Sequence, residues 1–322
     1  MSRSTSWFAF CLLALVAFPR LAVAQVTTLS GGTDLRTGMS LSPKFESITG
    51  LSSLFVNLRT VFPDSEGDRV IVVGQGDVEE VLDHTHLYNV YAQYKGPLGK
   101  WNVRFGRYLV PFGLHEHYDT ERLLLRAHEA ETLGMKLDEG VQLFGFHDAF
   151  DYSASISRGF QNRPTPIVRL GWHGDDVKIG VSYLYGHLPS FADEESVGID
   201  ELLPGAVVIR KHRAAIDYEQ TIGPLILRAE PIAGADEGKL VYGGFAEAGY
   251  ALSPDWELSA VGAYLHSDLV GTRWRSGAAV SYRVVPGVFA RGAYQSRDDI
   301  GSDSHAVFAQ VYAEFSHVLG GD

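Results

Sequence analysis

Residues 177–186, VKIGVSYLYG, alternate between two kinds of side chain. The odd positions are apolar or aromatic, whereas the even positions hold a lysine, two glycines, a serine and Leu184. Successive side chains of a β-strand point to opposite faces, so a period of two is typical of a strand whose faces meet different surroundings. The stretch therefore predicts a strand with one apolar and one mainly polar face.

The same alternation recurs along most of the chain. Clear examples are residues 87–95, 101–106, 150–157, 240–250, 274–283 and 307–315, and short turn sequences occur at 96–99, 174–176, 253–255 and 286–287. We count about sixteen such segments, with a range of about 12 to 18. Helical patterns do not alternate with them, which argues against a parallel α/β fold and predicts an all-β protein.

The N-terminus has the composition of a secretory signal. Arg3 precedes an apolar run from Trp7 to Phe18, and Ala22-Val23-Ala24 is a typical cleavage sequence. We expect residues 1–24 to be a cleaved signal peptide and residues 25–322 to be one domain. The formal net charge of −12 argues against a nucleic-acid partner.

Two all-β architectures fit the pattern: a soluble periplasmic β-sandwich, and a transmembrane antiparallel up-and-down β-barrel. Many Ala and Gly residues beside large aromatics favour the barrel, as do aromatics near strand ends. Tight turns also alternate with longer polar stretches at 76–83, 114–139, 188–204 and 295–304. Bacterial outer-membrane barrels have this asymmetry, so we expect a single barrel surrounded by outer-membrane lipid.

Residues 106–114, GRYLVPFGL, carry a family resemblance. The pair Gly106-Arg107 followed by the turn Pro111-Phe112-Gly113 resembles a segment of the phosphate-selective porin (porin O and P) family and of related bacterial outer-membrane porins. Glu121-Arg122 resembles the family's acidic-Arg pair at the start of a loop, and residues 140–145 and 152–159 are similar to its next hairpin. The resemblance implies a bacterial outer-membrane channel. It supplies no solute-binding residues, because no position matches a recognisable basic binding motif.

The same segment can be interpreted from its residue types alone. Pro111 cannot donate a hydrogen bond to a sheet, so it must end a strand or lie at its edge. Gly113 permits a backbone turn that a side chain would obstruct. The loop that follows contains three consecutive leucines, Leu123 to Leu125. It either folds inward and narrows the pore or covers the barrel from outside.

Assigning the polar strand faces to the interior gives a set of pore-lining candidates in which arginine predominates. They are Arg59, Lys95, Arg104, Arg169, Arg213, Arg228, Arg273, Arg275, Arg283 and Arg291, together with Arg36 and Lys178. A basic lining would favour anions. Acidic residues on the same faces, including Asp217 and Glu219, leave open a second interpretation, in which opposite charges pair and hold the wall rigid.

These features predict a porin-like channel for passive diffusion of small hydrophilic solutes or ions. A preference of the channel for anions is a further hypothesis. The alternatives are a non-conducting outer-membrane barrel that acts as adhesin or scaffold, and the soluble sandwich as a binding protein. We expect no enzymatic activity, because no nucleophile elbow or nucleotide-binding glycine motif is present, and no cofactor. The pairs His84/His86 and His115/His117 have a spacing that metal ligands use, but we expect rim histidines and no metal. Association with further copies of the chain is a further expectation.

Overall fold

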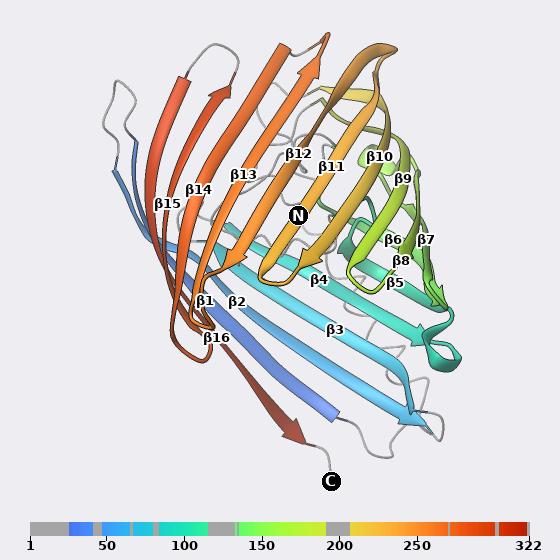
Figure 1. Ribbon diagram of the computed structural model, residues 1–322. Coiled ribbons are helices and arrows are strands. Elements are labelled where there is room, and N and C mark those ends of the chain that lie inside the picture. The colour runs from blue at the N-terminus through green and yellow to red at the C-terminus, as the bar shows by residue number, and fades with distance from the viewer. Residues whose placement is uncertain are drawn as a thin grey trace.

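The computed structural model describes residues 26–40, 47–64, 67–79, 84–114, 133, 135–190, 207–269, 271–299 and 303–320. These residues form one closed barrel of sixteen strands, in which each strand pairs with its neighbours in the chain and β1 pairs antiparallel with β16 (Figure 1). The predicted antiparallel up-and-down barrel is confirmed. A two-sheet sandwich does not form, because the sheet closes on itself. No helix within the described ranges is long and apolar enough to cross a membrane.

The strands follow one another with short connections at one end of the barrel. The first eight are β1 (Val26–Ser40), β2 (Ser47–Asp64), β3 (Gly67–Glu79), β4 (His84–Lys95), β5 (Asn102–Leu109), β6 (Leu137–His147), β7 (Phe150–Ser157) and β8 (Thr165–His173). The second eight are β9 (Val177–Pro189), β10 (Val208–Ile222), β11 (Leu225–Asp236), β12 (Lys239–Ala251), β13 (Trp256–Ser267), β14 (Gly271–Val285), β15 (Val288–Asp299) and β16 (Asp303–Gly320). Two single 3-10 turns, η2 (Pro97–Gly99) and η4 (Phe160–Asn162), lie between strands.

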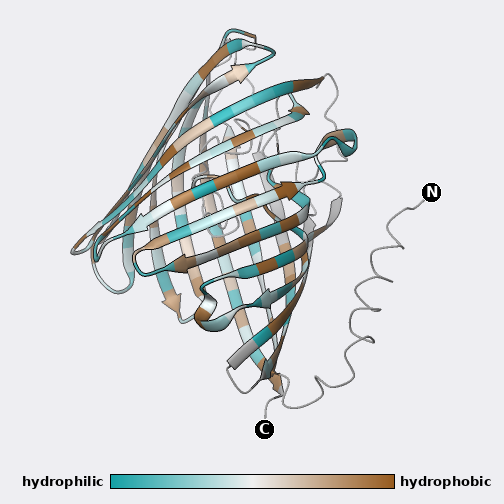
Figure 2. Ribbon diagram, turned by 90° about the vertical axis from the view of Figure 1, so that its right-hand side faces the viewer, coloured by the Kyte–Doolittle hydropathy of each residue, from teal (hydrophilic) through white to brown (hydrophobic). Residues whose placement is uncertain are grey.

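The alternation in the sequence separates an outer from an inner surface. Ile156, Leu170 and Val181 face outward with exposed fractions of 64%, 62% and 50%, while their neighbours Ser155 and Ser182 face inward and are buried. Figure 2 shows hydrophobic and hydrophilic residues alternating along the strands on the side that it displays. An apolar outside and a polar inside are the surface pattern of a barrel that spans a lipid bilayer.

The two ends of the barrel differ. One end, which we call the turn end, carries the connections 96–101, 148–149, 174–176, 223–224, 252–255 and 286–287 and the last residues of β16. The opposite end, the loop end, carries the longest connections, 110–136 and 190–207. Two of the predicted long loops are wrong. In the stretch 76–83, β3 continues to Glu79, and in the stretch 295–304, β15 and β16 together include all but residues 300–302. Backbone pairing continues there, with Asp77 opposite His86 and Asp298 opposite Asp303, because main-chain hydrogen bonds need no apolar side chain.

Aromatic side chains mark both ends of the outer surface. At the turn end, Tyr94 stacks on Trp101 with ring centroids 5.5 Å apart, and Trp256 lies 4.6 Å from Tyr282. At the loop end, Tyr242 lies 6.2 Å from Tyr264. Such rings prefer the interface between lipid tails and water, so the two rows define the height of the apolar belt.

Candidate functional site: the barrel interior and its constriction

The chain turns into the barrel directly after β5. The strand ends at Leu109, two residues before Pro111, as the missing proline N–H requires. Gly106 and Arg107 lie inside β5 opposite Tyr91 and Val90, not in the turn itself. The backbone N–H of Val110 donates to the carbonyl of Lys136 at 3.1 Å, which ties the two ends of the loop together.

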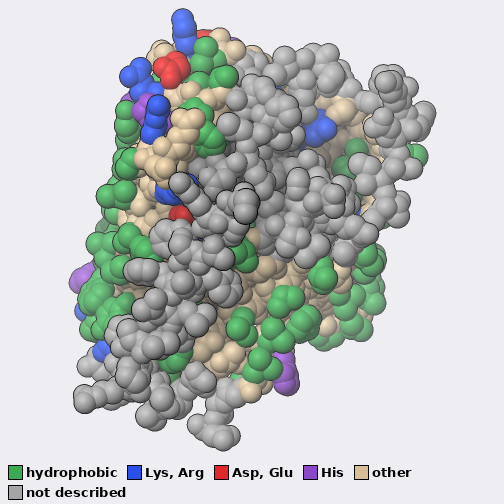
Figure 3. Space-filling model, turned by 180° about the vertical axis from the view of Figure 1, so that it is seen from behind, with side chains coloured by type: hydrophobic (Ala, Val, Ile, Leu, Met, Phe, Trp, Pro, Cys, Tyr) green, Lys and Arg blue, Asp and Glu red, His purple; other side chains and the backbone are tan. Residues whose placement is uncertain are grey.

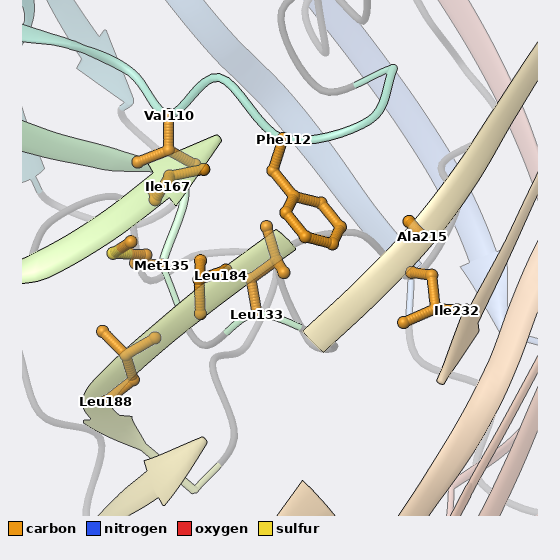
Figure 4. Close-up of a cluster of buried hydrophobic side chains, with 9 residues drawn as sticks. All are labelled: Val110, Phe112, Leu133, Met135, Ile167, Leu184, Leu188, Ala215 and Ile232. Carbon is orange, nitrogen blue, oxygen red and sulfur yellow. The ribbon is translucent and has the colours of Figure 1, made fainter. Parts of the chain in front are cut away.

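Residues 110–114, which we call the constriction segment, pack against the inner wall. Val110 and Phe112 form a buried apolar cluster with Leu133 and Met135 of the same loop (Figure 4). The wall contributes the inward-facing side chains Ile167 of β8, Leu184 and Leu188 of β9, Ala215 of β10 and Ile232 of β11. The described ends of the loop therefore lie inside the barrel. Residues 115–132, including the three leucines, lie outside the described part of the chain.

Two polar side chains of the wall bind the backbone of this segment. The hydroxyl of Ser182 accepts the N–H of Gly113 at 2.9 Å, and the carboxylate of Glu230 accepts the N–H of Leu114 at 2.7 Å. Gly113 has a φ of +55°, and a Cβ there would lie 2.2 Å from Glu230 Oε2. Only glycine therefore fits both the backbone conformation and the available space.

Leu114 carries the segment across to a second part of the wall. It is buried against Phe245, Val261 and Ala263, which face inward from β12 and β13. The sequence analysis did not identify Ser182 or Glu230 as anchors. The one signal it contained was Leu184, an apolar residue on an otherwise polar strand face, which is now explained by its contact with the segment.

The ten predicted pore-lining residues all lie at inward positions of their strands. Arg59 is opposite Val73, Arg104 is opposite Gln142, and Arg275 is opposite Arg297. The same alternation places the others inside: Lys95, Arg169, Arg213, Arg228, Arg273, Arg283 and Arg291. Their role in conduction stays a prediction, but their surroundings divide them into groups.

The first group is held by carboxylates on β7 to β12. Arg169 binds Asp217 with two hydrogen bonds, of 3.1 and 2.7 Å, and also contacts Asp151. Asp217 is only 1% exposed, so this pair is withdrawn from solvent. These residues follow the second interpretation of the sequence, in which opposite charges hold one another.

The same wall carries further pairs. Glu219 accepts hydrogen bonds from Arg228 at 2.7 Å and from Lys178 at 2.8 Å. Nearer the loop end, Arg213 lies 2.6 Å from Asp236, and both side chains are buried. On β14, outside this wall, Arg275 is equally buried, with an exposed fraction of 2%. Arg213 and Arg275 thus have little surface to offer a passing solute.

The second group is held by aromatic rings. The guanidinium of Arg104 lies 4.5 Å from the ring centre of Tyr91 and 4.8 Å from that of Phe144. Arg291 lies 5.1 Å from Phe289 and 5.3 Å from Tyr312. An aromatic face attracts a cation without neutralising its charge.

Arg291 is also fixed by an amide, because it donates to Oε1 of Gln310 at 3.0 Å. Arg283 approaches the Phe289 ring at 5.9 Å from the next strand. On β1, Arg36 binds Asp34 at 2.5 Å. The wall from β14 through β16 to β1 therefore combines ring-held arginines with the carboxylate pair of Arg36 and Asp34.

Metal ligation has little support in the described residues, where no group of three or more His, Cys, Asp or Glu side chains is arranged to hold an ion. His115 and His117, and the side chains of His84 and His86, lie outside the described part. That candidate stays untested.

Solved outer-membrane proteins share this fold. An anion-selective porin from Comamonas acidovorans is similar with a TM-score of 0.71 and 9% sequence identity, over 90% of this chain and 100% of that chain. OmpT, an outer membrane protein of Vibrio cholerae in a trimer form, is similar with a TM-score of 0.68 and 11% identity, over 91% and 100%. The outer membrane channel DcaP of Acinetobacter baumannii is similar with a TM-score of 0.66 and 10% identity, over 91% of this chain and 98% of that chain.

At these identities the likeness establishes the fold and nothing finer. No protein-family model matches the sequence, and no curated protein sequence matches it either. The chain is thus a sixteen-stranded barrel of the architecture that these outer-membrane proteins have.

Proposed function

We propose that the protein is a porin-like channel of the bacterial outer membrane, through which small hydrophilic solutes diffuse passively. The observation that carries the proposal is a polar, charged interior with a segment bound inside it by Ser182 and Glu230. Barrels of about 16 strands are wide enough to leave an aqueous channel. A rigidly held inward segment would narrow such a channel to a defined width. No bond is made or broken in this function.

We further propose that the channel prefers anions. The paired arginines Arg169, Arg213 and Arg228 contribute little field, because carboxylates lie against them. Arg104 and Arg291 carry positive charge at the inner wall, where aromatic rings hold them in place. A fixed cation on the wall of a narrow, low-dielectric passage stabilises an anion there more than it would in bulk water.

Planar-bilayer conductance of the barrel under a salt gradient tests both proposals. We expect discrete current steps and a reversal potential of anionic sign. Arg291→Gln should move the reversal potential toward zero. The matched control is Arg210→Gln, because Arg210 is an arginine on the outer face of the barrel.

Each other outcome is informative. Steps with a reversal potential of cationic sign would keep the channel and overturn the anion preference. Protein that runs as a folded, heat-modifiable barrel yet gives no steps would overturn the channel and favour the adhesin or scaffold alternative.

The resemblance to phosphate-selective porins and the association of copies both stay predictions. OmpT of Vibrio cholerae supports the second only by likeness of fold, since that protein has been solved in a trimer form. Mass measurement of the detergent-solubilised barrel, with the detergent contribution subtracted, would determine the number of copies.

A further inference from the structure

The outer face of β9 and β10 becomes polar near the loop end. Three register pairs lie there: Arg210 opposite His187, His212 opposite Tyr185, and Ala214 opposite Tyr183. Farther down β10, Ile216 is 52% exposed and belongs to the apolar belt. We call the set Tyr183, Tyr185, His187, Arg210 and His212 the rim patch. Figure 3 shows, on the face it displays, Lys, Arg and His side chains beside hydrophobic and acidic ones at the upper margin.

A tyrosine fixes the orientation of the His212 ring. The Tyr183 hydroxyl lies 2.9 Å from Nδ1 of His212, and the Tyr185 ring centre lies 4.7 Å from that of His212. When the phenol O–H donates to Nδ1, the neutral imidazole carries its proton on Nε2. Among the described residues, Nε2 of His212 has no hydrogen-bond partner. In that arrangement Nε2 of His212 is an N–H donor that no described residue uses.

Arg210 adds a cation next to this donor. Its side chain is exposed, and within the described residues its guanidinium has no hydrogen-bond or ion-pair partner. The neighbouring acid is Glu237, which accepts the backbone N–H of Arg210 at 2.6 Å through Oε1. Arg210 can thus turn its planar fork of N–H groups toward a ligand, which is the arrangement that phosphate favours.

We propose that the rim patch binds the phosphate group of an anionic lipid headgroup. The inference rests on the proposed function only in placing the barrel in a membrane. The patch lies where the apolar belt ends, so it faces headgroups rather than lipid tails or the lumen. A guanidinium, an imidazole N–H and two interfacial tyrosines match a phosphate that is attached to an apolar chain.

Two other tyrosine–histidine pairs at the loop end provide internal comparisons. In the first, the Tyr294 hydroxyl lies 2.8 Å from Nδ1 of His305, which repeats the rim-patch geometry without an adjacent arginine in register. In the second, the ring centre of Tyr242 lies 5.0 Å from that of His266, and both nitrogens of His266 are occupied: Nδ1 by Thr272 at 2.8 Å and Nε2 by Asp268 at 3.3 Å. His266 offers no free donor and is the matched control.

Native mass spectrometry of the detergent-solubilised barrel, titrated with phosphatidylglycerol or with phosphatidylcholine, tests the proposal. We expect phosphatidylglycerol to be retained preferentially. Arg210→Gln and His212→Phe should each weaken that retention about tenfold, as the loss of a charge-assisted hydrogen bond implies. His266→Phe should leave it unchanged. The Phe substitutions keep an aromatic ring, so a folded barrel is expected in each case.

Three outcomes would overturn the proposal. Equal retention of the two lipids would show that the patch does not select an anionic headgroup, because both lipids carry a phosphate. An equal loss in His266→Phe would reduce the effect to general interfacial polarity. Displacement of the lipid by inorganic phosphate at matched concentration would assign the patch to free phosphate instead. Because the patch faces away from the lumen, conductance of the same variants separates this proposal from the channel, and lipid binding can fail while conductance persists.

Discussion

The carboxylate of Glu230 accepts the backbone N–H of Leu114 at 2.7 Å, which joins two residues 116 positions apart in the chain. With the Ser182 hydroxyl on Gly113, it holds the constriction segment against β9 and β11. Both contacts are buried. The position of the segment inside the barrel therefore depends on two wall side chains as well as on the segment itself.

Loss of the serine anchor should loosen the segment. Ser182→Ala leaves the buried N–H of Gly113 without its acceptor, which costs about 1–3 kcal/mol. We expect noisier open-channel current and a lower urea midpoint for unfolding in lipid vesicles. Ser155→Ala is the control, because the Ser155 hydroxyl is buried on the same inner wall with no hydrogen-bond partner in the described structure. Equal behaviour of the two variants would contradict the anchoring role.

Gly113 and Gly223 allow backbone strain to be separated from a steric clash. Their φ angles are +55° and +56°, but a Cβ at Gly223 would meet nothing within 4 Å, whereas at Gly113 it would overlap Glu230. Gly223→Ala should cost about 1–2 kcal/mol, the price of a left-handed conformation. Gly113→Ala should cost more and should change unit conductance, because the segment must move. A conductance unchanged by Gly113→Ala would show that the segment does not limit the pore.

The charge cluster of β7 to β10 should be sensitive to the removal of one partner. Asp217→Asn removes the doubly bonded carboxylate of Arg169 while Asp151 stays in contact with it, which should cost about 1.5–3 kcal/mol. Lys178→Gln removes a cation that is 46% exposed from its pair with Glu219, and should cost about 0–1 kcal/mol. Unfolding of the two variants in vesicles measures the difference. Similar losses would mean that Asp217 is solvated in the working barrel.

Tryptophan fluorescence tests the position of the barrel in the bilayer. Trp256 lies at the turn end of the outer surface, and Ala260 is an outward position farther along the same strand. In a variant that keeps only Trp256, a lipid with its nitroxide near the headgroup should quench the tryptophan emission more than a lipid with its nitroxide near the end of the acyl tail. For a lone tryptophan introduced by Ala260→Trp the order should reverse, since four residues span about 13 Å of strand. Failure to reverse would place the apolar belt elsewhere on the barrel.

The sequence predicted those features that depend on local alternation. Whether Arg104 or Arg291 points inward follows from its position relative to the next apolar residue, so the inward basic set could be identified without coordinates. The partner that holds each arginine could not be identified from the sequence. Rings such as Tyr91 and carboxylates such as Asp217 come from neighbouring strands, whose register is set by the whole barrel.

The constriction shows the same limit. Pro111 and Gly113 indicated a turn, but the contacts across 69 and 116 residues left no motif in the sequence beyond inward apolar residues such as Leu184. The polar stretch 295–304 was misassigned as a loop for the opposite reason. Its side chains resemble those of a loop, while its backbone continues a hairpin that is already in register.

The apolar cluster under the constriction segment also has a consequence for the order of assembly. Ile167, Leu184 and Ile232 face the lumen from three different strands, and Phe112 covers them. Phe112 emerges first from the ribosome, but its binding surface exists only after β8 to β11 have paired and curved. Contacts of such sequence separation form late, because a long loop must close first. A newly closed barrel would therefore pass through a stage with a wet, apolar inner wall, and docking of residues 110–114 would be the step that completes maturation.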